Sequence, residues 1–242
     1  MTIDEQRARV WDRMRKECPR FTQNHDPFDD PFMVESLVLD DFIGWKPFQN
    51  ARVMDAGANV GVWTAFCALH GAFVHAYEAD PVTFGAMCQM LQDTNLIASV
   101  HPRNLALWKE TGFVHFQGDE NLKVCKARNG AIQVVGKNVS EFAPSTIKVP
   151  CISFAEALGP ERWDCVKMDI EGAEFEILLN TNPEALSQID HLHVEFHNGW
   201  ADDVTYKKVL DKLHALFASK GYMNSEGRYD WAQFRNKARE IA

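Results

Sequence analysis

From residue 51 onward, the hydrophobic positions of the chain switch repeatedly between the two-residue period of a strand and the spacing of a helix. ARVMDAG at 51–57 and FVHAYEAD at 73–80 are apolar runs of strand length, and each precedes a segment with apolar positions three and four apart. DCVKMDIEGAEFEILLN at 164–180 repeats this order. Alternating strands and helices build right-handed βαβ units around a parallel sheet. We therefore predict an α/β domain over residues 46–242.

Three segments depart from this alternation. Helical spacing in two stretches, interrupted by the Pro- and Asp-rich NHDPFDDP, predicts an N-terminal helical extension or lid over residues 1–45. Residues 113–150 contain short β-type runs and are interpreted as a β-rich insertion. VTYKKVLDKLHALFASKG at 204–221 predicts a helix closed by Gly221, and the residues after it predict an antiparallel hairpin.

Composition narrows the function classes. With 242 residues, 46% of them hydrophobic, the chain has the size of one α/β domain with appendages. The six cysteines form no CxxC pair, so we expect reduced thiols and neither a zinc site nor a disulfide framework. A formal net charge of −9 argues against binding to long nucleic acids. No apolar run reaches the length of a signal peptide or membrane span, so we expect a soluble, cytoplasmic protein.

VMDAGANVGVWT at 53–64 is the first candidate binding motif. A glycine-rich turn after the first strand of an α/β sheet presents backbone N–H groups and a helix N-terminus to a ligand at the sheet's carboxyl edge. The dinucleotide fingerprint would need glycine at positions 59 and 62, where this chain has Asn59 and Val62. A dehydrogenase is therefore disfavoured.

The residues that remain in this motif suit an amino-acid moiety. Asp55 can hold an ammonium group, directly or through water, while the turn N–H groups face a carboxylate. Glu78, which ends the second predicted strand, can accept hydrogen bonds from both hydroxyls of a ribose. S-adenosylmethionine carries both moieties, so we predict that it is bound by Asp55, Gly57, Asn59, Gly61, Thr64 and Glu78.

Five motifs in order resemble those of FkbM-type S-adenosylmethionine-dependent methyltransferases. They are VMDAGANVGVWT, VHAYEADPVTF, NLAL at 104–107, VKMDIEGAEFEIL at 166–178 and HLHVEFH at 191–197. The resemblance spans roughly residues 51–235, and its most specific piece is KMDIEGAE at 167–174.

This resemblance implies a class I methyltransferase fold: a Rossmann-like sheet of seven strands, the last antiparallel, with helices on both faces. It also implies O-methylation of a hydroxyl on a small-molecule or glycan acceptor. Asp55, Gly57, Asn59 and Gly61 would contact the methionine end of the cofactor, and Glu78 its ribose. Asn104 and Ala106 would lie near the adenine, and Asp169 beside the transferring methyl group.

Candidate catalytic residues lie at the ends of the fourth and fifth predicted core strands. An alcohol is a poor nucleophile at neutral pH, so a base or a metal ion usually assists its reaction. Glu195 and His197 are two residues apart and would share one face of a strand. We take His197 as the candidate general base; a structural histidine bonded to backbone, or a metal or acceptor contact, is the alternative. Asp169, Glu195 and His197 together also suit a divalent cation, although carboxylates collect near helix starts for capping reasons too.

Other functions remain open at this point. The same cofactor can serve methyl transfer to nitrogen or to the ribose hydroxyl of a nucleotide. A noncatalytic protein that keeps the S-adenosylmethionine fold is a further alternative. The intact glycine turn and Glu78 favour an enzyme over this last reading. The sequence indicates neither the acceptor nor the oligomeric state.

Overall fold

The computed structural model describes residues 49–117, 133–135 and 146–239. The N-terminal extension predicted over residues 1–45 lies outside these ranges, as does most of the predicted insertion. The domain boundaries therefore stay a prediction.

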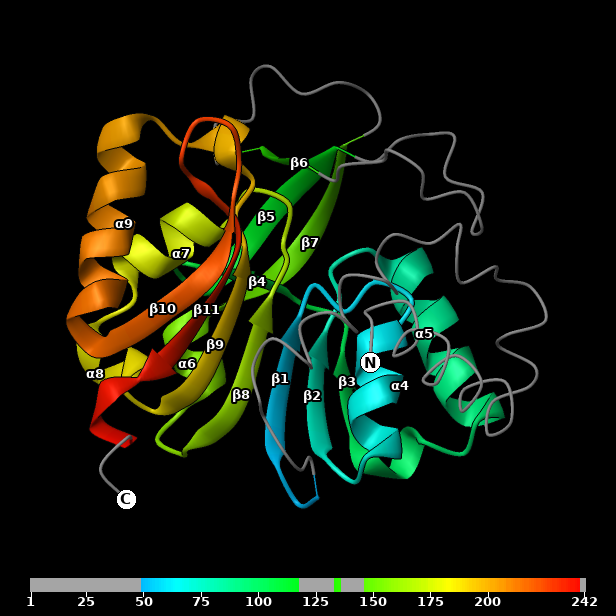
Figure 1. The fold of residues 1–242 in the computed structure, drawn as a ribbon. Helices are drawn as coiled ribbons and strands as arrows, with labels where there is room; N and C mark the ends of the chain where they lie inside the picture. The colour runs from blue at the N-terminus through cyan, green and yellow to red at the C-terminus, as the bar shows by residue number, and fades with distance from the viewer. Residues whose placement is uncertain (1–48, 118–132, 136–145, 240–242) are drawn as a thin grey trace.

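A seven-stranded sheet forms the centre of the molecule, in the order β10-β11-β9-β8-β1-β2-β3 (Figure 1). β11 pairs antiparallel with both β9 and β10, whereas the strands from β9 to β3 pair in parallel. The predicted α/β class and the antiparallel last strand are confirmed. The strands are β1 (Arg52–Ala56), β2 (Phe73–Tyr77), β3 (Val100–Arg103), β8 (Trp163–Met168), β9 (Ile189–Glu195), β10 (Phe217–Met223) and β11 (Tyr229–Asn236).

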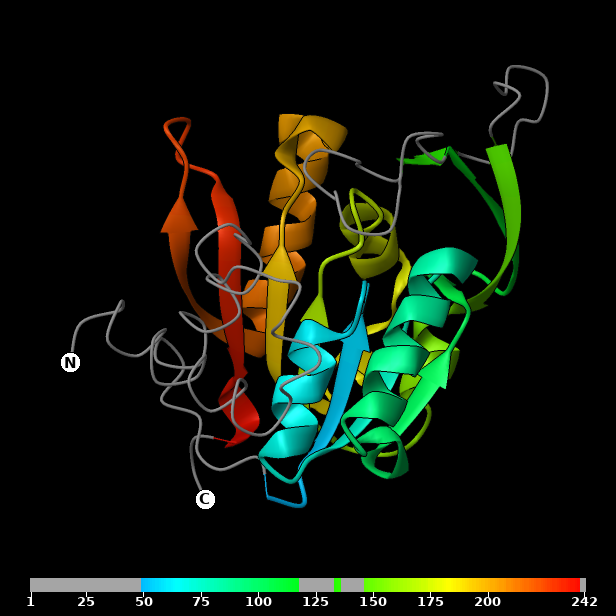
Figure 2. The same cartoon turned by 90° about the vertical axis from the view of Figure 1, so that its right-hand side faces the viewer.

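Helices cover both faces of this sheet, as the two views show (Figures 1 and 2). One face carries α4 (Val62–Leu69) and α5 (Pro81–Asp93). The other face carries α6 (Phe154–Leu158), α7 (Glu174–Asn180), α8 (Pro183–Leu186) and α9 (Asp203–Leu216). Short 3₁₀ turns complete the described elements: η1 (Ile97–Ser99), η3 (Asn198–Trp200) and η4 (Lys237–Arg239).

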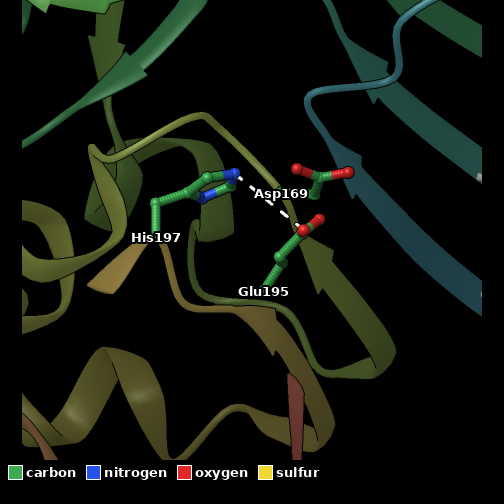
Figure 3. Close-up of side chains that lie close together, drawn as sticks. All are labelled: Asp169, Glu195 and His197. Carbon is green, nitrogen blue, oxygen red and sulfur yellow. Dashed lines mark ion pairs between the residues drawn. The ribbon is translucent and has the colours of Figure 1, made fainter. Parts of the chain in front are cut away.

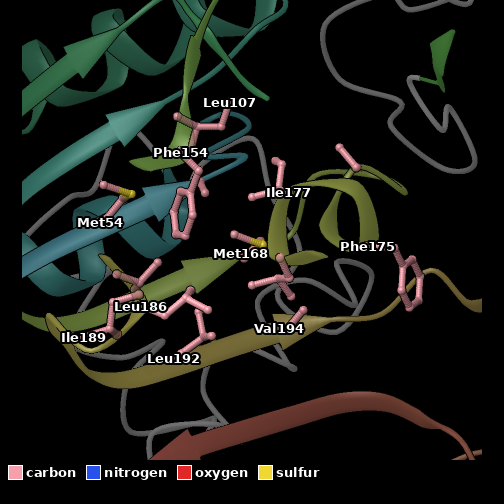
Figure 4. Close-up of a cluster of buried hydrophobic side chains, with 14 of the residues drawn as sticks. Met54, Leu107, Phe154, Met168, Phe175, Ile177, Leu186, Ile189, Leu192 and Val194 are labelled. Carbon is pink, nitrogen blue, oxygen red and sulfur yellow. The ribbon is translucent and has the colours of Figure 1, made fainter. Parts of the chain in front are cut away.

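The hydrophobic core has one cluster on each face of the sheet. Val53 and its neighbours pack under α4 and α5, while Met54 faces the larger cluster under the other helices. Figure 4 shows this larger cluster, in which Met168, Leu192 and Val194 of the sheet meet Ile177 of α7. Because successive strand residues point to opposite faces, both faces of the central strands are apolar. This explains the nearly continuous apolar runs in the sequence.

A second, four-stranded sheet has the order β4-β7-β5-β6. Its strands are β4 (Ala106–Trp108), β5 (Gly112–Gln117), β6 (Gln133–Val135) and β7 (Thr146–Ser153). β5, β6 and β7 lie wholly or partly in the segment 113–150. Leu107 and Trp108 of β4 are buried in the larger cluster, so this sheet is joined to the main core.

The predicted helix over 204–221 is wrong at its C-terminal end. α9 ends at Leu216, and Gly221 lies within β10, paired with Ala232 of β11. A Cβ atom on Gly221 would lie 2.2 Å from the carbonyl oxygen of Trp231. The glycine therefore permits close approach of two strands instead of closing a helix. The predicted C-terminal hairpin is confirmed, and it begins earlier than expected.

Within the described ranges, no helix is long and apolar enough to cross a membrane. The predicted cytoplasmic location stays a prediction.

Candidate functional site

The glycine turn between β1 and α4 packs so closely against its neighbours at Gly57 and Gly61 that neither position has room for a side chain. Gly57 has φ 79°, and a Cβ atom there would lie 1.8 Å from the carbonyl oxygen of Asp169. Gly61 has φ 85°, and a Cβ atom there would lie 2.6 Å from Cγ of Met87 in α5. Asn59 also has a positive φ, 51°, which asparagine tolerates better than most residues. The turn is therefore packed against α5 and against the loop after β8.

Glu78 follows β2 and fastens the glycine turn. Its carboxylate accepts hydrogen bonds from the backbone N–H groups of Asn59 and Asp80, each at 2.8 Å. Burial raises the pKa of Glu78 from 4.5 to about 7, because desolvation of the carboxylate outweighs the two hydrogen bonds. Asn104 donates to the carbonyl oxygens of Glu78 and Ala79, at 2.9 and 3.1 Å. The residues predicted for ribose and adenine thus lie together, with Ala106 close by in the chain but buried in β4.

Asp55 lies at the end of β1 and is completely buried. Thr64 Oγ1 donates to Asp55 Oδ2 at 2.6 Å, and Lys167 Nζ lies 3.6 Å from Asp55 Oδ1. The sequence predicts that Asp55 holds an ammonium group of the ligand. In the structure, Asp55 Oδ2 is taken up by Thr64, while Oδ1 faces Lys167 without a hydrogen bond to it, so contact of Asp55 and Thr64 with the cofactor stays a prediction.

Lys167 connects Asp55 to Asp169 across the sheet. Its Nζ atom donates to Asp169 Oδ2 at 3.3 Å, and both side chains are buried. Burial by itself disfavours the ammonium form, but the carboxylates of Asp169 and Asp55 outweigh it and raise the pKa of Lys167. Burial also raises the pKa of Asp55, against the opposing effect of Lys167. In the sequence, Lys167 appears only as the first residue of KMDIEGAE, which does not indicate its contact with Asp55 and Asp169.

His197 lies just past the end of β9 and is surrounded by carboxylates. Nδ1 is 2.9 Å from Glu174 Oε1, and Nε2 is 3.1 Å from Glu171 Oε2 and 4.0 Å from Glu195 Oε1. Burial lowers the pKa of His197, but Glu171 and Glu174 outweigh this effect and raise the pKa to about 11. Because both ring nitrogens face carboxylates, the arrangement favours the protonated imidazole and so opposes the predicted role of general base while Glu171 and Glu174 stay in place.

The loop after β8 brings these carboxylates to His197. Glu171 and Gly172 have φ values of 54° and 101°, which turn the chain sharply before α7 begins at Glu174. Glu174 Oε1 also accepts hydrogen bonds from the backbone N–H groups of Ile170 and Gly172, at 3.1 and 3.2 Å. Carboxylates near a helix start are expected for capping reasons alone; here Glu171 and Glu174 also pair with His197.

Asp169, Glu195 and His197 each offer a ligand atom, and these atoms lie within 4.8 Å of one another (Figure 3). The cluster joins the ends of β8 and β9, as the sequence predicts. We call Asp169, Glu171, Glu174 and Glu195 the acidic cluster. These carboxylates outnumber the neighbouring cations, Lys167 and His197, so the site favours a positively charged ligand.

Comparisons with known proteins show which proteins this chain resembles. The family model described as "Methyltransferase FkbM domain" matches residues 55–223. "Methyltransferase 1" of Beauveria bassiana (strain ARSEF 2860) is 24% identical over 218 residues, which cover 83% of this chain and 84% of that protein. "Methyltransferase sdnD" of Sordaria araneosa is 24% identical over 208 residues, covering 76% and 78%. The solved structure "delta-N METTL16 MTase domain" has a TM-score of 0.50 at 11% identity, covering 97% of this chain and 96% of that chain. This last likeness concerns the fold alone.

Proposed function

The chain belongs to the FkbM methyltransferase family and is an S-adenosylmethionine-dependent methyltransferase, and we propose that it methylates a hydroxyl group of a small-molecule or carbohydrate-like acceptor. One observation supports the proposal: the acidic cluster lies at the carboxyl ends of β8 and β9, and the backbone of its member Asp169 packs against Gly57 of the glycine turn. In an open α/β sheet, ligands bind at this edge. A hydroxyl that receives a methyl group must lose a proton, and carboxylates at this edge are placed to receive it.

In this proposal, the glycine turn and Glu78 bind the cofactor. Glu78 accepts hydrogen bonds from the ribose hydroxyls, while Asn104 fixes the loop beside the adenine. Asp55, held by its hydrogen bond from Thr64, lies under the turn on the side of the methionine end of the cofactor. Asp169 lies beside the methyl group, where its negative charge stabilises the sulfonium of the bound cofactor. The protein then has to place the acceptor in line with the methyl group and exclude water.

The proton of the acceptor hydroxyl passes to a carboxylate of the acidic cluster, for which Glu195 is our choice. Glu195 lies at the end of β9 and is partly exposed, so an acceptor can reach it. His197 is then a positioning group, because in its protonated form it holds Glu171, Glu174 and Glu195 together. The role of general base predicted for His197 applies only if a ligand displaces one of its carboxylate partners.

We further propose that Asp169, Glu195 and His197 can hold a divalent cation. Two carboxylate oxygens and a neutral imidazole nitrogen suit Mg²⁺ or Mn²⁺, and to serve as that ligand His197 would give up its Nε2 proton and its contact with Glu171. Glu174 is bonded to the other ring nitrogen of His197, as second-shell carboxylates are in many metal sites. When bound, such an ion lowers the pKa of a coordinated hydroxyl.

Calorimetry with MnCl₂ tests the cation. We expect the wild type to bind Mn²⁺, and Asp169→Asn and Glu195→Gln each to weaken binding at least about tenfold. Glu226→Gln, which changes an exposed carboxylate far along the chain, is the matched control. Absence of Mn²⁺ binding, or equal binding by all variants, would remove the cation from the proposal and leave methyl transfer untouched.

An acceptor screen tests the methyl transfer. The purified protein is incubated with S-adenosylmethionine and panels of glycosides, phenols, amines and nucleosides, and products are detected by a mass gain of about 14 Da. Products formed from glycosides or phenols at a hydroxyl group support the proposal. Methylated amines or nucleoside ribose as the sole products would replace it with the corresponding alternative.

A further inference from the structure

We propose that Lys167 is a positioning residue that holds the Asp169 carboxylate toward the sulfonium of the cofactor, and so makes the site prefer S-adenosylmethionine to S-adenosylhomocysteine. The inference rests on the proposed place of Asp169 beside the methyl group. In this proposal Lys167 orients Asp169, in addition to balancing the charge of buried Asp55.

The backbone around Asp169 is already fixed, which leaves its side chain as the part that needs a partner. The N–H group of Asp169 donates to the carbonyl oxygen of Ala56 at 3.0 Å, and its own carbonyl group packs against Gly57. Within the described part of the chain, Lys167 hydrogen-bonds the Asp169 carboxylate, at 3.3 Å. Lys167 lies two residues earlier, within β8, so the pairing of β8 with β1 fixes the backbone from which its side chain reaches Asp169.

Balancing the charge of Asp55 does not fully explain why a lysine is buried at position 167. Lys167 is the register partner of Asp55 in the β1–β8 pair, but its ammonium group lies nearer to Asp169 than to Asp55. Asp55 has a second partner, the hydroxyl of Thr64. Burying a lysine and two carboxylates is costly, and apolar residues of similar size often give equal or greater stability. With apolar residues in place of Lys167, the Asp169 side chain would lack the partner that fixes it at the ligand edge.

The two cofactor forms offer a direct probe of this role. S-adenosylmethionine has a methyl group and a positive charge on sulfur, and S-adenosylhomocysteine has neither. A carboxylate held near the sulfur favours the charged form. The ratio of the two affinities therefore reports on Asp169, whereas general damage to the pocket weakens both ligands together.

The experiment uses calorimetric titrations of both ligands in an Asp55→Asn background. Removing Asp55 first means that Lys167→Met leaves one buried carboxylate without its cation, that of Asp169, instead of two. Four proteins are compared: Asp55→Asn alone, with Lys167→Met, with Asp169→Asn, and with both changes. Should Lys167→Met fail to fold by circular dichroism, Lys167→Gln in the same background replaces it.

We expect Lys167→Met to lower the affinity for S-adenosylmethionine about tenfold and that for S-adenosylhomocysteine less than about threefold. In the Asp169→Asn protein, adding Lys167→Met should leave the affinity ratio unchanged, because Lys167 acts through Asp169. Equal weakening of both ligands, or a change of ratio that persists without Asp169, overturns the positioning role. A wild-type protein that binds neither ligand would instead overturn the proposed function itself.

Discussion

The carboxyl edge of the main sheet, where we propose that the ligand binds, has two sides that are stabilised by different interactions. On the side of β1 and β2, Glu78 and the glycine turn are joined through backbone N–H groups. On the side of β8 and β9, the acidic cluster is joined through the side-chain cations Lys167 and His197. The first side depends on backbone shape, and the second on the balance of buried charges. Substitutions on the two sides should therefore fail in different ways.

Gly57→Ala should have the largest effect on stability, because Gly57 lies where the glycine turn contacts the backbone of Asp169. A Cβ atom would overlap the Asp169 carbonyl oxygen, and the positive φ strains any other residue. We expect a loss of more than about 4 kcal/mol in the free energy of unfolding, measured by urea denaturation. Gly85→Ala is the control, since Gly85 lies in α5 with open space around it; it should stabilise by about 0.5–1 kcal/mol. Similar behaviour of the two variants would show that the close contact does not constrain the turn.

Glu174→Gln should have the next largest effect, on the charge-balanced side. Glu174 is completely buried and bonds to His197 and to two backbone N–H groups. A neutral amide leaves the partly buried His197 ring with one counter-charge fewer and disturbs a fully buried hydrogen-bonded group, so we expect a loss of about 2–4 kcal/mol. Glu184→Gln, at an exposed site in the first turn of α8, should change stability by less than about 0.5 kcal/mol. A cost for Glu174→Gln as small as for its control would mean that Glu174 does not hold His197.

Glu78→Gln should have the smallest effect on stability but a clear effect on pH dependence. Because the folded pKa is raised from 4.5 to about 7, protonated Glu78 stabilises the fold below 4.5, and this contribution is lost as the pH rises through about 7. The ribose hydroxyls donate to the carboxylate form, so wild-type affinity for S-adenosylmethionine should rise through the same range. Calorimetry between about pH 6 and 8 should find this rise absent in Glu78→Gln, with affinity about tenfold lower at the upper end. Parallel pH profiles for the two proteins would assign the titration to another group.

The acidic cluster illustrates why the candidate site was only partly predictable. The sequence predicts that Asp169, Glu195 and His197 lie together, because the ends of parallel strands meet at one edge, and the structure brings them together there. The sequence could not show that His197 faces carboxylates at both ring nitrogens, because this depends on the left-handed turn at Glu171 and Gly172. The role of Lys167 is hidden in the sequence for a similar reason. A lysine within an apolar strand gives no sign of its partner until the register of β1 and β8 is known.

The sequence by itself determined the alternation of strands and helices, the glycine turn and the identity of the family, because these depend on local periodicity and on backbone conformations that few residues adopt. The tertiary structure alone decided where α9 gives way to β10, since Phe217 and Gly221 are placed by contacts with β11 rather than by local preference. It also decided which charges meet. Asp55 lies beside Lys167 and accepts a hydrogen bond from Thr64, and the neighbouring carboxylates raise the pKa of His197. Long-range packing sets the distances on which these electrostatic energies depend.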